Sequence, residues 1–273
     1  MTTTVGVPVD VPVNFGTSVE QPPVVAPPPV ARPLATPSGP LGSLALVDAL
    51  LRDRGTILDR IAAGQDLAAT MRVMVATIAV AMAVVGAALG TYRGDIQIAY
   101  AAIKLPLVLL GTAALSAPAL TAIGAALGRK PRLAADLVLV TTALAFGALV
   151  LAACTPLILF GRAIDLSYQR MIILIVLAFT IAGIAALRVV MRALDLEGAK
   201  GWRMATFGLA VVFSLVGGQL SWALRPYLVR PRAPEVTFLR PLEGSLYDAI
   251  VGAAASARGL YTRDRAPLPG EQL

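Results

Sequence analysis

The chain has 273 residues, of which 57% are hydrophobic and 14% are charged, and its formal net charge is +7. Soluble domains carry about 25% charged residues, so this composition indicates a protein whose main solvent is lipid. The absence of histidine, together with a single cysteine, Cys154, excludes an intrachain disulfide, a thiolate metal cluster and histidine-based catalysis or haem ligation. We therefore expect no catalytic residue, no metal and no cofactor. The arginines flank apolar runs, which favours an anionic membrane surface over nucleic acid as their partner.

The first 70 residues divide into two parts. Residues 1–42 hold ten of the twenty prolines and lack a helical period, which predicts a disordered Pro-rich tail. Residues 43–70 have apolar residues at helical spacing and charges of both signs opposite them, with Ser43 as the expected N-cap and Gly55 as the expected break. They predict amphipathic cytoplasmic helices at the membrane boundary. A protein partner could bind these helices or the Pro-rich tail.

Five apolar runs follow, and each is long enough to cross a bilayer at ~1.5 Å per helical residue. They predict an all-α, polytopic membrane helix bundle with a five-helix transmembrane domain over residues 71–228 and an external tail with a short helix over residues 229–273. The expected spans are Val73 to Tyr92, Leu105 to Leu127 after an amphipathic lead-in from Ile96 to Ile103, Leu137 to Phe160, Met171 to Leu187, and Met204 to Leu224.

Two of the spans carry a pair of glycines four residues apart, Gly86 with Gly90 and Gly124 with Gly128. In apolar segments such pairs let helix backbones approach closely, and we interpret both as packing positions. Close packing of this kind also leaves a homo-oligomer open.

Lysine and arginine near the span ends indicate the orientation. The side that holds the N-terminus has nine of these residues and the other side has seven. The positive-inside rule therefore favours a cytoplasmic N-terminus and an external C-terminus in a bacterial inner membrane.

Lys104, two residues before Pro106, is the most informative charge. If its helix begins near Ile96, Lys104 lies within the apolar layer and is a functional residue by default. If the helix begins near Leu105, Lys104 is a boundary lysine whose ammonium reaches the headgroups, and we favour this interpretation.

The end of the fifth span holds the other candidate functional or anchoring residues. Gln219 is most simply an interhelical hydrogen-bonding group. Trp222 and Arg225 suit the membrane–water boundary, and Pro226 ends the helix. Near the third span, Asp136 follows Arg132 by four residues, where a solvated or paired carboxylate is expected.

Three short strings resemble a group of bacterial five-span membrane proteins that is similar in layout to the Yip (Ypt-interacting protein) superfamily. They are Ile103-Lys104-Leu105-Pro106-Leu107, Ala152-Ala153-Cys154-Thr155-Pro156, and Ser221-Trp222-Ala223-Leu224-Arg225-Pro226. The resemblance covers roughly residues 44–252 and implies a helical bundle with a cytoplasmic N-terminus. Eukaryotic relatives act in vesicle trafficking and bind small GTPases through an acidic segment, whereas this N-terminal tail carries only Asp10 and Glu20.

These observations predict a non-enzymatic membrane protein that acts as a scaffold, a membrane organiser or a subunit of a membrane complex. The alternative is a transporter or channel component with a polar path near Lys104 and Gln219. A membrane enzyme ranks third, because an acid–base pair is hard to assemble without histidine.

Overall fold

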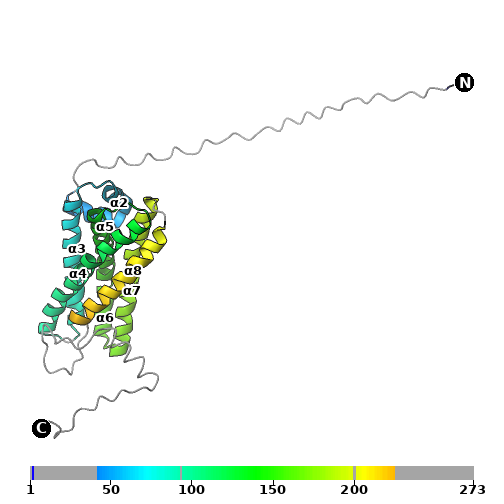
Figure 1. Ribbon diagram of the computed structural model, residues 1–273. Coiled ribbons are helices and arrows are strands. Elements are labelled where there is room, and N and C mark those ends of the chain that lie inside the picture. Colours follow the sequence, from blue (N-terminus) through cyan, green and yellow to red (C-terminus); the bar gives the residue numbers. More distant parts are fainter. Residues whose placement is uncertain (1, 3–41, 93, 199–200, 225–273) are drawn as a thin grey trace, which may run out of the picture. The chain divides into compact units, whose positions relative to one another are not determined.

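The computed structural model describes residues 2, 42–92, 94–198 and 201–224. All regular structure within these residues is helical, in eight helices (Figure 1). The predicted all-α fold is therefore confirmed. The Pro-rich tail, the external tail, Arg225 and Pro226 lie outside the described residues.

The amphipathic segment forms two short helices, α1 (Ser43–Arg52) and α2 (Arg54–Ala62). The break between them is at Asp53, whose carboxylate accepts hydrogen bonds from the backbone N–H of Thr56 at 3.4 Å and from its hydroxyl at 2.5 Å. Gly55 lies inside α2, so the expected break at this residue is wrong by two positions. Ser43 is the first residue of α1 rather than its cap.

Five helical segments of the described chain are long and apolar enough to cross a membrane. The third of these segments is split into two helices at Cys154, which directly precedes Thr155 and Pro156. The helices are α3 (Leu67–Gly90), α4 (Ile96–Ala126), α5 (Leu133–Ala153) with α6 (Thr155–Ala163), α7 (Tyr168–Leu196) and α8 (Trp202–Leu224).

The long helices pack in the order α8, α4, α3, α5 and α7, with a smaller contact between α7 and α8. The most apolar part of Leu133–Ala163, which comprises α5 and α6, is 61% buried, against 6% for that of α8, so this segment lies at the centre and α8 at the periphery. Most of the buried side chains between them are aliphatic. The fully buried ones include Met74, Ile78, Val85, Leu105 and Leu120.

The contact between α3 and α4 requires two glycines. A Cβ atom on Gly86 would lie 2.3 Å from the carbonyl oxygen of Ala101, and one on Gly90 would lie 2.5 Å from the Cα atom of Ile98. Neither distance is sterically possible, so only glycine allows the two backbones to approach this closely. The expectation that this glycine pair serves helix packing is confirmed.

Apolar side chains also cover much of the outward surface of the long helices. They include Val80, Val84, Leu107, Leu115, Ile173, Val176, Leu177, Phe207 and Val211. Large exposed apolar surfaces are rare on soluble monomers and are what a bilayer contacts. The described chain is therefore a membrane-type helix bundle.

Candidate functional site

Lys104 lies within a helix and inside the protein. Helix α4 begins at Ile96, eight residues earlier, so the expectation of a helix beginning near Leu105 is wrong. The lysine is 5% exposed, and Gln97 on the same face of α4 is 4% exposed. The Lys104 ammonium lies 5.9 Å from the centroid of the Tyr100 ring, a distance at which a cation is attracted to the ring face.

The packing of α4 against α8 gives the depth of Lys104. The two helices are antiparallel, because Ile123 of α4 meets Gly208 and Gly111 meets Leu220. Seven residues separate Lys104 from Gly111, which is about 10 Å of helix. The last described residue of α8, Leu224, lies four residues or about 6 Å beyond Leu220. Lys104 therefore lies near the depth at which α8 ends, enclosed by protein.

The other described candidates lie near this end of α4 and α8. Pro106 is buried inside α4, where it removes the backbone bond to the carbonyl of Ala102. Gln219 and Trp222 are half-buried and stand one turn apart in the last part of α8. The structure thus places the four described candidates on two adjacent helices.

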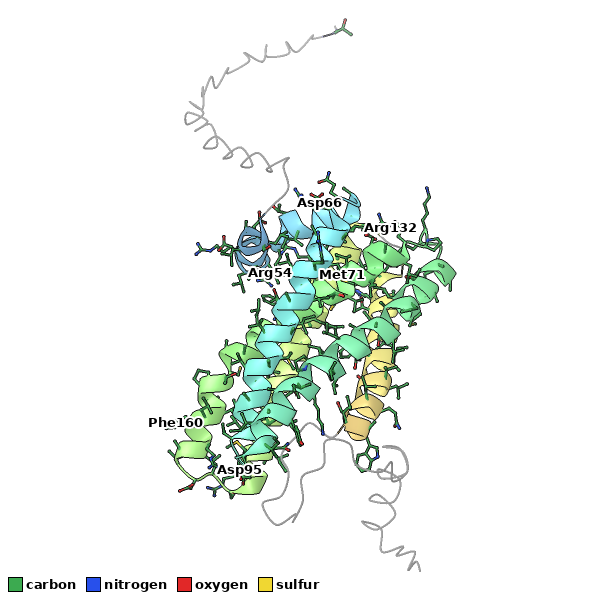
Figure 2. The ribbon with its side chains drawn as sticks, turned by 90° about the vertical axis from the view of Figure 1, so that its left-hand side faces the viewer. Arg54, Asp66, Met71, Asp95, Arg132 and Phe160 are labelled. Atoms are coloured by element: carbon green, nitrogen blue, oxygen red, sulfur yellow. The ribbon has the colours of Figure 1, made fainter. Side chains whose placement is uncertain are left out.

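A second polar centre lies at the opposite end of the bundle, near Asp66 and Arg132 in Figure 2, whereas Asp95 and Phe160 mark the other end. It consists of Arg129, Arg132, Asp136 and Glu197, hereafter the charge cluster. Arg129 Nη2 lies 2.6 Å from Asp136 Oδ1, and its Nε donates to Glu197 Oε2 at 2.9 Å. Arg132 Nη2 donates to Glu197 Oε1 at 2.5 Å.

Neighbouring helices complete the hydrogen bonding of the charge cluster. The Thr121 hydroxyl on α4 donates to Asp136 Oδ2 at 2.7 Å, and Arg132 Nη1 donates to the carbonyl oxygen of Ala62 at 2.7 Å. The cluster therefore connects the end of α2, both helices around the α4–α5 loop, and the end of α7. Asp136 is fully buried, so these partners replace the water that its carboxyl group would otherwise contact.

The C-terminal end of α4 places Arg129 next to Asp136. Gly128 has a φ of +84°, and the N–H of Arg129 bonds to the carbonyl of Gly124 at 2.9 Å. This is the Schellman arrangement, which ends a helix with a glycine in the left-handed region. A Cβ atom on Gly124 would lie 3.3 Å from the Arg129 Cδ atom, so Gly124 leaves room for the arginine stem. This glycine pair ends a helix and seats an arginine, which corrects its interpretation as a packing pair.

Opposing effects act on the pKa of Arg129. Burial disfavours the charged guanidinium, but the hydrogen bonds and negative charges of Asp136 and Glu197 outweigh burial and raise its pKa above the ordinary value. Arg129 stays positive at every physiological pH.

The geometry therefore supports a structural clamp at this end. Among the described residues, no group of three or more His, Cys, Asp or Glu side chains is arranged to hold a metal ion. The sequence pattern suggested Arg132 as the neighbour of Asp136, yet Arg129 makes that ion pair and Arg132 binds Glu197. Glu197 is 65 residues from Arg132, and no local spacing signals that contact.

Comparison with known proteins adds no assignment to this geometry. No protein-family model matches the chain, and neither a curated protein nor a solved structure matches it.

Proposed function

We propose that the protein is a non-enzymatic integral membrane protein that acts as a scaffold, a membrane organiser or a subunit of a membrane complex. We place it in a bacterial inner membrane with a cytoplasmic N-terminus, so that the charge cluster lies at the cytoplasmic end. The resemblance to the Yip superfamily stays a prediction that accords with this layout.

One observation carries the proposal: small residues bring the helices into close contact. Gly86 and Gly90 bring α3 onto the backbone of α4. A Cβ atom on Gly147 would lie 3.0 Å from the carbonyl oxygen of Ala182 and 3.1 Å from the Cβ atom of Ala186, both on α7. Two of the hollows between the described helices, one beside Arg129 and one beside Arg162, each have a volume of about 10 Å³. A single water needs about that much space, so neither hollow passes a solute. Close helix contacts of this kind suit a protein that keeps one arrangement of its helices, as a scaffold or complex subunit does.

A transporter or channel component is the second candidate, and the burial of Lys104 favours it. An ionisable residue inside a membrane protein marks an ion or substrate path by default. The flux of the parent protein decides between this role and the scaffold.

The test compares the purified parent with Lys104→Met, a variant that keeps the length of the apolar stem without the charge. Both proteins are reconstituted into liposomes and assayed for flux of protons, monovalent ions and small solutes. The scaffold proposal expects no flux from either and normal insertion of the variant. Flux by the parent that disappears in Lys104→Met would establish the transporter instead.

Assembly and orientation are measured separately in native membranes. A scaffold or complex subunit should migrate in gentle detergent as a defined particle heavier than the 28.2 kDa chain. A reporter fused to the N-terminus should be active in the cytoplasm, and one fused after Leu273 should be active outside it. A monodisperse monomer under conditions that preserve known complexes would contradict the scaffold, and both termini on one side would contradict the five-span topology.

A further inference from the structure

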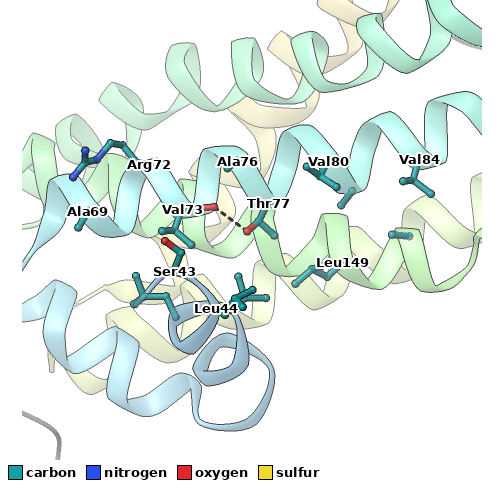
Figure 3. Close-up of a pocket in the computed structure, with 14 residues that line it drawn as sticks. Ser43, Leu44, Ala69, Arg72, Val73, Ala76, Thr77, Val80, Val84 and Leu149 are labelled. Atoms are coloured by element: carbon teal, nitrogen blue, oxygen red, sulfur yellow. Dashed lines mark hydrogen bonds between the residues drawn. The ribbon is translucent and has the colours of Figure 1, made fainter. Parts of the chain in front are cut away.

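An apolar groove of about 800 Å³ runs along the outer side of α3 (Figure 3). Helix α1 forms one wall, α3 the floor, and the end of α5 the far wall. Most of the lining is aliphatic, and the hydroxyl of Thr77 donates to the carbonyl of Val73 at 2.8 Å and is therefore already satisfied. The α3 residues that line the groove are Ala69, Arg72, Val73, Ala76, Thr77, Val80, Ala81 and Val84.

The groove is longer than the hydrocarbon depth of one leaflet, so an acyl chain can lie along it. From Ala69 to Val84 the groove follows fifteen residues of α3, which is about 22 Å. One leaflet of a bilayer has a hydrocarbon depth of about 15 Å, half of the ~30 Å core. Because α3 spans the membrane, the groove crosses the leaflet next to its N-terminal end, and Leu44 and Leu149 bound it on the sides.

A single cation stands at the headgroup end of the groove. Arg72 lies beside Ala69, and its side chain extends toward the N-terminal end of α3, with Nε 3.4 Å from the carbonyl oxygen of Ala68 (Figure 3). Its side chain is exposed, and within the part of the chain that the structure describes, no carboxylate forms an ion pair with it. The guanidinium is therefore available to a phosphate at the depth where a phospholipid carries one.

We propose that this groove is a binding site for one anionic phospholipid, whose acyl chain lies along α3 and whose phosphate pairs with Arg72. The apolar walls suit the chain. The cation at one end favours a headgroup with net negative charge over a zwitterionic one, in which a second, positive group offsets the charge of the phosphate. The site depends on the membrane setting of the bundle but not on whether the protein is a scaffold or a transporter. In either case, the lipid would fasten α1 to the spanning helices.

The test measures lipid binding to the full chain by native mass spectrometry and by thermal unfolding in mild detergent. Phosphatidylglycerol and phosphatidylcholine with identical acyl chains are the probes, and inorganic phosphate is a third arm. Arg72→Gln should weaken phosphatidylglycerol binding about fivefold, since one basic residue at an anionic surface contributes about 1 kcal/mol. It should weaken phosphatidylcholine binding less, because the choline cation offsets the charge of the phosphate. Ala76→Leu, which fills the groove, should weaken binding of both lipids.

Two matched variants serve as controls. Arg188→Gln removes an exposed arginine near the same end of α7, and Ala114→Leu enlarges an exposed alanine of α4 outside the groove. Neither should change lipid binding. If Arg72→Gln and Arg188→Gln lower phosphatidylglycerol binding equally, the binding is general surface electrostatics and the proposal fails. It also fails if Ala76→Leu binds as the parent does, or if inorganic phosphate stabilises the protein as much as the lipid.

Discussion

Breaking the ion pair between Arg129 and Asp136 should be among the most damaging single changes in the bundle. Arg129→Met keeps most of the apolar stem but leaves a fully buried carboxylate with the Thr121 hydroxyl as its described partner. Removing one member of a buried ion pair costs about 3–5 kcal/mol, because the remaining charge stays desolvated. We expect a loss of this size in the free energy of unfolding.

The reciprocal change should cost less. In Asp136→Asn, Arg129 keeps its bond to Glu197, whose side chain is 17% exposed and therefore partly hydrated. The remaining loss is about 1–3 kcal/mol, the range for a disrupted charge-assisted hydrogen bond. The double variant removes both charges at once, and its cost should be clearly smaller than the sum of the two single costs.

The assay is reversible unfolding in mixed micelles, followed by the fluorescence of Trp202, which lines the same small hollow as Arg129. Glu197→Gln is the control, because Arg129 then retains Asp136, and it should cost less than Arg129→Met. If the single costs of Arg129→Met and Asp136→Asn simply add in the double variant, the two side chains do not act as a pair. If Arg129→Met costs under about 1 kcal/mol, the buried carboxylate is not the desolvated charge that its burial indicates.

Two further outcomes follow from the packing and from the α1–α2 junction. Gly86→Ala should lower the free energy of unfolding by about 1–3 kcal/mol, because the added methyl group meets the Ala101 carbonyl. Gly183→Ala is the control, because Gly183 has open space around it, and this change should be neutral or stabilising. Equal effects of the two changes in the same unfolding assay would refute the close contact. The hydrogen bonds from Thr56 lower the pKa of Asp53, so their stabilisation is present above its ordinary value of 3.8 and is lost as the pH falls through the lowered value. The difference in melting temperature between the parent and Thr56→Val should therefore be largest near neutral pH and shrink below pH 3.8; a constant difference across this range would contradict the role of the carboxylate.

The spanning helices were predictable from sequence because lipid imposes one strong rule. A backbone in hydrocarbon must satisfy its hydrogen bonds within its own segment, so each long apolar run becomes a helix. The extension of α4 back to Ile96 was visible in its amphipathic lead-in. The split at Cys154 was only partly visible, through Pro156 near the end of the run.

The charge cluster was not predictable, because it depends on contacts between distant segments. Asp136 stands four residues after Arg132, the spacing that brings side chains together on one helix, yet Arg132 precedes α5 and turns toward Glu197. The turn at Gly128 carries Arg129 over Asp136 instead. In the sequence, a buried carboxylate at a helix start looks the same as a solvated one.

The span of the charge cluster along the chain has a consequence for biogenesis. Arg129, Arg132 and Asp136 leave the ribosome together, but Glu197 follows Arg132 by 65 residues, about 3–13 s later at ordinary rates of synthesis. During that interval Arg132 lacks its carboxylate partner, although it can already donate a hydrogen bond to the Ala62 carbonyl at the end of α2. Synthesis of α7 therefore supplies Glu197 last, and its two ion pairs with Arg129 and Arg132 complete the charge cluster at this end of the bundle.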